Sequence, residues 1–215
     1  MSAPEVTVID YGVGNLLSVQ RGLEHCGAKV ILTADPEKIL AAERVVLPGV
    51  GAFVNAMQAL ENLDLVSVIR ELDPRKIPLL GICLGMQLLL EESEEFGVTA
   101  GLGLIPGRVI PVPDRALSGA TQKIPHIGWS ALQPSNELGG WQHSLQQDNS
   151  PGEAAYFVHS FIAVPTDPAH RIADCLYGGH KIPATISRDQ ITGCQFHPEK
   201  SGEVGLKILR RFILQ

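Results

Sequence analysis

Short apolar segments alternate with amphipathic segments along the first hundred residues of the chain. The apolar runs with the length and β-branched content of buried strands are residues 5–10, 28–33, 44–48 and 77–82. The segments with helix formers or apolar residues at helical spacing are residues 16–26, 35–43, 53–60, 65–72 and 86–93. Strands that alternate with helices predict βαβ units and a largely parallel sheet.

The second half of the chain has a different pattern. Its apolar segments are short, rich in β-branched and aromatic residues and separated by turns, which indicates additional strands, some of them antiparallel. Ser135–Glu153 is polar and rich in glycine, and we expect a surface loop there. Val204–Leu214 has the pattern of an amphipathic helix. No repeat or linker divides the sequence, so residues 1–215 are predicted to form a single domain.

Composition and charge narrow the classes of function. The net charge of −6 argues against nucleic-acid binding, which usually requires a basic surface. No apolar run has membrane-spanning length, and the N-terminus lacks the pattern of a signal peptide, so we expect a cytoplasmic protein. Four cysteines without paired spacing argue against disulfides and a zinc site, and we expect neither a metal nor a cofactor. The acidic residues 91–95 are predicted to be the solvated end of a helix.

Cys83 stands between two glycines, where a predicted strand meets a predicted helix. In the segment LGICLG, Gly81 and Gly85 permit the close backbone approach that a tight strand-to-helix turn requires. Such a turn pushes the central side chain outward, and the following helix N-terminus favours a thiolate. A small buried cysteine beneath the helix is the alternative interpretation.

A thiolate nucleophile needs a base, and His197 is the best candidate among seven histidines. It follows the predicted strand ITGCQF, precedes a proline, and has Glu199 two residues on, where a carboxylate can orient the imidazole. A chance His-Pro-Glu in a turn is the alternative. The other histidines are predicted to be either solvated, namely His25, His143, His170 and His180, or satisfied in the core, namely His126 and His159.

Together, GICLGMQ, FHPEKS and the segment VVLPGVGAF at residues 45–53 resemble the triad, or class I, glutamine amidotransferases. This resemblance implies a flavodoxin-like three-layer α/β fold. Within the family, the motifs IDYGVGN, PHIGW and YFVHSF are most similar to the glutaminase subunits of imidazole glycerol phosphate synthases, which serve histidine biosynthesis. Ser130 departs from that pattern, because asparagine more usually follows this tryptophan.

The resemblance implies that glutamine is hydrolysed to glutamate and ammonia through a cysteine thioester. Cys83 is then the nucleophile, His197 the acid and base, and Glu199 the orienting carboxylate. The implied oxyanion hole consists of Val50, Gly51 and Leu84. The implied glutamine-binding residues are Gly49, Gln87, Ser160 and Phe161, with Gly51 beside them.

The same resemblance implies a partner, a (β/α)₈ cyclase subunit that receives the ammonia and activates the glutaminase through the Pro48–Gly51 loop. A heterodimer is expected, with Asn15, Trp129, Tyr156 and Lys200 at the interface. The alternatives are the glutaminase of another complex such as pyridoxal phosphate synthase, a cysteine peptidase of similar architecture, and a catalytically silent regulatory subunit.

Overall fold

The apolar runs of the first half form the parallel part of a large sheet, as predicted. The structure, a computed structural model, describes residues 3–135 and 140–215. Within these residues a nine-stranded sheet is formed, in spatial order, by β2 (Lys29–Thr33), β1 (Glu5–Ile9), β3 (Val45–Gly49), β4 (Leu79–Cys83), β13 (Ile191–Cys194), β12 (His180–Arg188), β11 (Arg171–Tyr177), β8 (His126–Pro134) and β9 (Ala154–His159). The strands from β2 to β13 are parallel, and those from β13 to β9 are antiparallel.

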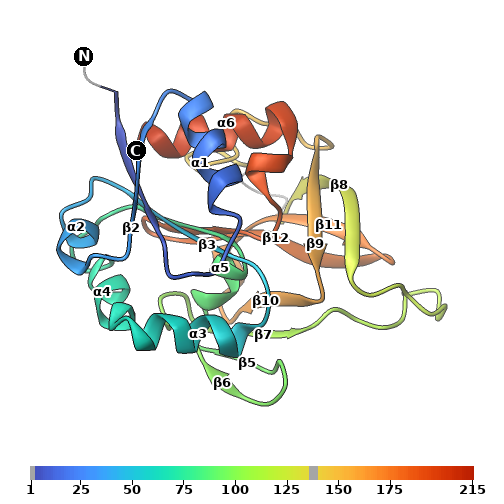
Figure 1. Ribbon diagram of the computed structural model, residues 1–215. Helices are drawn as coiled ribbons and strands as arrows, with labels where there is room; N and C mark the ends of the chain where they lie inside the picture. Colours follow the sequence, from blue (N-terminus) through green and yellow to red (C-terminus); the bar gives the residue numbers. More distant parts are fainter. Residues whose placement is uncertain (1–2, 136–139) are drawn as a thin grey trace.

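Helices cover both faces of the parallel part, so the fold has three layers (Figure 1). The helices are α1 (Leu16–His25), α2 (Pro36–Leu40), α3 (Phe53–Asn62), α4 (Leu65–Glu71), α5 (Leu84–Leu88) and α6 (Gly202–Ile213), with single 3₁₀ turns at η1 (Pro168–His170) and η2 (Pro198–Lys200). Figure 1 shows α1 and α6 together on one face of the sheet and α2, α3 and α4 on the other. No helix in the described ranges has the length and apolar content needed to cross a membrane.

Alternation along the strands divides the core into two clusters. In β3, Val46 packs in the cluster beneath α1 and α6, whereas Val45 and Leu47 pack in the cluster beneath α3 and α4. Successive strand residues point to opposite faces, which is why a parallel strand covered on both sides reads as a continuous apolar run.

A second, four-stranded sheet adjoins the first. Its strands are, in order, β10 (Phe161–Pro165), β7 (Gly107–Pro111), β5 (Glu92–Ser93) and β6 (Thr99–Ala100). The helix predicted over residues 86–93 is therefore wrong beyond Leu88, and the solvated helix end predicted at residues 91–95 is instead the short strand β5 with a turn after it. Leu88 is followed by two more fully buried leucines, so no polar face continues the helix, and the chain turns to pair with β7.

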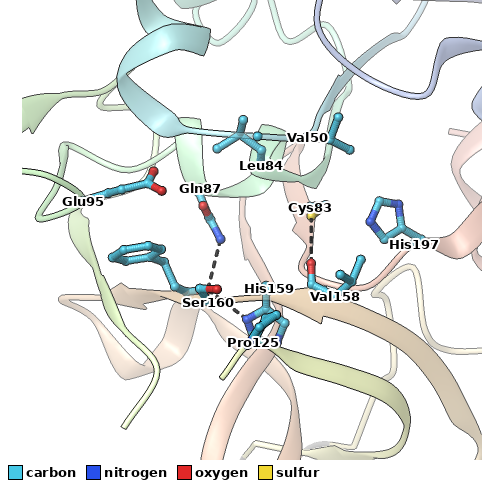
Figure 2. Close-up of a pocket in the computed structure, with 12 residues that line it drawn as sticks. Val50, Cys83, Leu84, Gln87, Glu95, Pro125, Val158, His159, Ser160 and His197 are labelled. Atoms are coloured by element: carbon cyan, nitrogen blue, oxygen red, sulfur yellow. Dashed lines mark hydrogen bonds between the residues drawn. The ribbon is translucent and has the colours of Figure 1, made fainter. Parts of the chain in front are cut away.

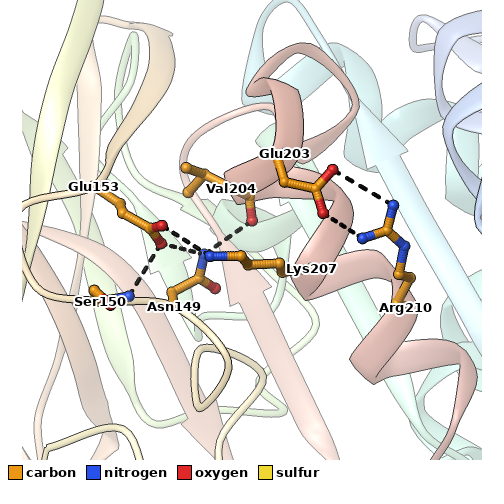
Figure 3. Close-up of polar contacts among 7 residues, drawn as sticks. All are labelled: Asn149, Ser150, Glu153, Glu203, Val204, Lys207 and Arg210. Atoms are coloured by element: carbon orange, nitrogen blue, oxygen red, sulfur yellow. Dashed lines mark hydrogen bonds and ion pairs between the residues drawn. The ribbon is translucent and has the colours of Figure 1, made fainter.

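The predicted surface loop at Ser135–Glu153 is only partly a surface. Residues 136–139 lie outside the described residues. Beyond them, Trp141, Leu145 and Gln146 are buried, so this part of the prediction is wrong. Figure 3 shows how the segment attaches to α6: Asn149 Nδ2 donates to the Val204 carbonyl at 3.1 Å, and Lys207 Nζ lies 2.8 Å from Glu153 Oε1. The buried apolar residues Trp141 and Leu145 were missed because most residues around them in the sequence are polar.

Candidate active site

Cys83 occupies a strained turn between β4 and α5. Its backbone has φ 55° and ψ −109°, outside the helical and strand regions. Close packing of α5 against β3 requires glycine at position 85, because a Cβ on Gly85 would lie 1.9 Å from the Leu47 carbonyl oxygen. The strand-to-helix turn predicted from Gly-x-Cys-x-Gly is therefore confirmed, and its strain holds the thiol at the carboxyl end of a central strand.

His197 and Glu199 form a buried pair beside this turn. His197 Nδ1 lies 2.8 Å from Glu199 Oε1, and the Glu199 side chain is fully buried. His197 Nε2 is buried and has no hydrogen-bond partner within residues 3–135 and 140–215. Figure 2 shows the His197 ring and Cys83 at the same end of one pocket. The free ring nitrogen is thus available to the thiol.

The charge of His197 depends on its two neighbours. Burial lowers the pKa of His197, but the adjacent Cys83 sulfur and the hydrogen-bonded Glu199 carboxylate outweigh burial and raise this pKa to about 9. At neutral pH the imidazole is therefore protonated. The imidazolium is lost as the pH rises through about 9.

A pocket of about 270 Å³ opens in front of the pair (Figure 2). It is lined by Val50, Gly51, Cys83, Leu84, Gln87, Glu95, Pro125, Val158, His159, Ser160, Phe161 and His197. These residues come from the ends of β3, β4 and β9, from α5 and the start of β10, and from the segments after β5, before β8 and after β13. Because the parallel strands end at one edge of the sheet, segments far apart in the sequence meet there.

Gln87 is held by both hydrogens of its side-chain amide. Its Nε2 donates to the Phe161 carbonyl and to Gln195 Oε1, each at 3.0 Å, and Gln195 Nε2 lies 3.8 Å from Cys83 Sγ. In the part of the chain that the structure describes, no group donates a hydrogen bond to the Gln87 carbonyl oxygen, so this oxygen is available to a ligand. Gln87 is buried and is therefore not a residue of the helix surface.

Most of the residues assigned to oxyanion and glutamine binding meet at this pocket, and Gly49 does not line it. Val50, Gly51, Leu84, Gln87, Ser160 and Phe161 line the pocket. A Cβ on Gly49 would lie within 3.0 Å of the Tyr11 hydroxyl and of Leu84. Gly49 therefore permits close packing behind the pocket.

Sequence reasoning missed Glu95, Pro125, Val158 and His159 as lining residues. Glu95 is 9% exposed, and its Oε2 accepts a hydrogen bond from the Phe53 amide at 2.6 Å. The sequence does show the Glu95 carboxylate, but Glu95 stands in an acidic run, and this run was predicted to be exposed to solvent. His159 was correctly predicted to be a satisfied core histidine, and its contact with the pocket was not foreseen.

The four residues assigned to a partner interface differ in exposure. Trp129 is 59% exposed and packs edge-on against half-buried Tyr156, with ring centroids 6.0 Å apart. Lys200 is exposed, and Asn15 caps α1 by accepting a hydrogen bond from the Ser18 amide. The His197 amide donates to the Tyr156 carbonyl at 3.0 Å, so this surface adjoins the catalytic pair. Trp129 is therefore not part of the core.

Comparison with known proteins agrees with the geometry. A family model described as glutamine amidotransferase class-I matches residues 7–215. The structure resembles a crystal structure of a glutamine amidotransferase with a TM-score of 0.71 at 15% identity, covering 97% of this chain and 96% of that one. It also resembles the structure of PurLQS from Thermotoga maritima with a TM-score of 0.69 at 20% identity, covering 99% and 98%. At these identities the likeness establishes the fold, which is that of the class I glutamine amidotransferases.

Similarity in sequence reaches further than the fold. The imidazole glycerol phosphate synthase subunit HisH 1 of Legionella pneumophila (strain Lens) is 49% identical over 208 residues, covering 97% of this chain and 98% of the relative. The HisH subunit of Bacillus cereus is 44% identical over 210 residues, covering 96% and 93%. This chain belongs to the HisH family of class I glutamine amidotransferases, and the resemblance read from its motifs is confirmed.

Proposed function

We propose that this chain is the glutamine-hydrolysing subunit of an imidazole glycerol phosphate synthase and serves histidine biosynthesis. The observation that carries the proposal is the Cys83–His197–Glu199 constellation at the end of a glutamine-sized pocket, in a chain of this family. We propose that the whole chain, residues 1–215, forms this one domain, which the family match over residues 7–215 supports. The alternatives of another amidotransferase complex and of a silent regulatory subunit are not favoured.

The proposed reaction begins with a thiolate and an imidazolium. Cys83 Sγ attacks the carboxamide carbon of glutamine and forms a tetrahedral intermediate. His197 then gives its proton to the departing nitrogen, ammonia leaves, and a γ-glutamyl thioester remains. His197 next removes a proton from water, which attacks the thioester; collapse of this second tetrahedral intermediate releases glutamate and the Cys83 thiolate, so the thiolate and the imidazolium are restored. Glu199 holds the imidazole orientation and stabilises the imidazolium throughout.

The oxyanion of each tetrahedral intermediate needs backbone donors. Leu84, the residue after the nucleophile, is the first residue of α5, and its amide lies at the helix start, where N–H groups lack helical partners. We assign the second donor to the Val50–Gly51 segment, which lines the same pocket as Cys83 and has a glycine with φ +99°. A loop with this freedom is able to turn a peptide toward the pocket only when the partner is bound.

The partner subunit we propose is a (β/α)₈ cyclase that adds the ammonia to a ribulosyl phosphate intermediate. Ammonia is nucleophilic only while it is unprotonated, and it diffuses away unless it is confined. A sealed route between the two subunits therefore suits the chemistry. Ile127 and Trp129 are exposed on β8, opposite Val158 and Tyr156 on β9, and this apolar surface adjoins the site and supports docking there. The four cysteines are free, which fits the reducing cytoplasm as the proposed compartment.

The test of this function is release of glutamate from glutamine by the purified chain, alone and with the cyclase subunit and its nucleotide substrate. We expect slow hydrolysis alone and a large stimulation in the complex, with formation of imidazole glycerol phosphate. A chain that hydrolyses no glutamine under either condition would contradict the proposal.

Glu95 is expected to supply the counter-charge for the α-ammonium group of glutamine. Its carboxylate is buried at the pocket wall, and within the described residues the pocket is lined by no other carboxylate. Glu95→Gln keeps the shape and an acceptor for the Phe53 amide but removes the charge. We expect KM for glutamine to rise by roughly 10-fold to 100-fold, with a much smaller change in kcat, measured in the complex. Asp73→Asn, which alters a carboxylate paired with Arg188 away from the pocket, is the control. An unchanged KM in Glu95→Gln would remove Glu95 from the binding site.

A further inference from the structure

Two histidines outside the catalytic pair form a continuous hydrogen-bonded chain that ends at the glutamine pocket. Ser130 Oγ lies 2.9 Å from His126 Nε2, His126 Nδ1 lies 2.9 Å from His159 Nε2, and His159 Nδ1 lies 2.9 Å from the Phe161 carbonyl oxygen. Both histidines are buried, and they face one another across paired strands β8 and β9. Nothing in the reaction described above uses His126.

The hydrogen bonds from Ser130 through His126 and His159 to Phe161 can all be donated in only one direction. The Phe161 carbonyl only accepts, so His159 carries its hydrogen on Nδ1, and a neutral His159 must accept at Nε2. His126 then donates from Nδ1 and accepts at Nε2, which leaves the Ser130 hydroxyl as the donor. Burial lowers the pKa of His126 to about 4, and burial also lowers that of His159 to about 4 although the hydrogen bond to the Phe161 carbonyl acts to raise it, so both rings are neutral at pH 7.

The hydrogen-bonded series of side chains ends at Phe161, which lines the glutamine pocket. The Phe161 carbonyl receives hydrogen bonds from both His159 and Gln87. Phe161 is the first residue of β10, and Ser160 alone connects it to β9. Gln87 in turn holds Gln195, which lies beside Cys83. Any shift of the Phe161 peptide therefore moves the Gln87 acceptor and the Ser160–Phe161 wall together.

His126 itself is fixed by stacking. Its ring is nearly parallel to those of Phe157 and Tyr177, with centroids 5.0 Å and 4.0 Å away. The imidazole therefore has two separable properties, an aromatic surface that packs and an N–H that orients His159.

We propose that His126 is a positioning residue for glutamine binding. Through His159 it holds the Phe161 carbonyl, and with it Gln87, in the arrangement that receives the substrate. This inference rests on the proposed glutaminase function.

Two substitutions separate the properties of His126. His126→Phe keeps the stacked ring but removes the donor to His159. His126→Asn removes the ring but places an amide N–H near the position of Nδ1. We expect His126→Phe to melt near the wild-type temperature and to raise KM for glutamine by about 10-fold, with kcat changed less than threefold. We expect His126→Asn to melt lower and to keep a KM within about threefold of wild type.

The measurements are glutamate release in the complex with the partner subunit, thermal melting, and ¹⁵N NMR of the histidine rings. His180→Phe is the matched control, since it removes a histidine bonded to the Arg115 carbonyl outside the pocket. The NMR signals of wild type are expected to report Nδ1–H and bare Nε2 on both histidines.

The inference is overturned if KM instead follows the melting temperature, so that KM is normal in His126→Phe and raised in His126→Asn. It is also overturned if either ring carries its hydrogen on Nε2. Should His126→Asn not fold, KM of His126→Phe against His180→Phe decides. A wild-type complex without glutaminase activity would refute the proposed function, whereas the NMR result would still test the hydrogen-bonded chain.

Discussion

Cys83→Ala is expected to abolish glutamine hydrolysis, with a loss in kcat on the order of 10⁶-fold. The thiolate is the only group that forms the covalent intermediate in the proposed mechanism, and no other described cysteine lines the pocket. In the complex, synthesis driven by added ammonium salts is expected to survive, because only the source of ammonia is removed. The measurement is the rate of imidazole glycerol phosphate formation with glutamine and, separately, with ammonium chloride.

The same variant is expected to change the proton affinity of His197. Cys83 is one of the two neighbours that hold the pKa of His197 at about 9, so its removal lets burial act against Glu199 alone. We expect the pKa to fall in Cys83→Ala, measured by NMR titration of the ring. Loss of ammonia-driven synthesis in a folded complex, or an unchanged His197 pKa, would contradict this account of the pair.

Gly51→Val is expected to remove activation by the partner while leaving partner binding intact. Gly51 has φ +99°, where a β-branched residue is strained, and its surroundings are open, so the effect acts on the backbone alone. If the Val50–Gly51 peptide supplies an oxyanion donor in the activated state, its loss lowers stimulated turnover by roughly 10²-fold to 10³-fold. Glutamate release with and without the partner, together with an affinity measurement, tests this expectation.

Gly27→Val is the matched control for backbone strain. Gly27 follows α1, has φ +93° and, like Gly51, has no atom within 4 Å of an added Cβ. A comparable loss of stability with normal activation is expected there. Full activation of Gly51→Val, or equal activity of the wild type with and without its partner, would refute switching through this loop.

The sequence predicted the parts of this molecule in which local pattern and packing agree. The strand ending at Cys83 is a continuous apolar run because both faces of its sheet are covered. Gly85 is required by contact with the Leu47 backbone, and Gly81 by contact with the Gly85 backbone. The pairing of His197 with Glu199 followed from a spacing of two residues. These features are local, so they can be read from neighbouring positions in the chain.

The features that were missed depend on contacts between distant segments. Glu95 stands in an acidic run typical of a solvated helix, yet β5 pairs with β7 and brings its carboxylate to the Phe53 amide and the pocket. His126 and His159 were predicted to be core histidines, but their pairing requires the register of β8 on β9. Trp141 was read as part of a surface loop because its neighbours are polar.

The most direct test of the central claim is mapping of the cysteine that reacts with a chloroketone analogue of glutamine. Cys175 and Cys194 are buried, and burial raises the pKa of each to about 12; burial also raises the pKa of Cys26. Only Cys83 lies at the pocket, so mass spectrometry of the treated protein is predicted to find one adduct, on the peptide containing Cys83, and none in Cys83→Ala. An adduct on Cys26, Cys175 or Cys194 with Cys83 unmodified would contradict the account.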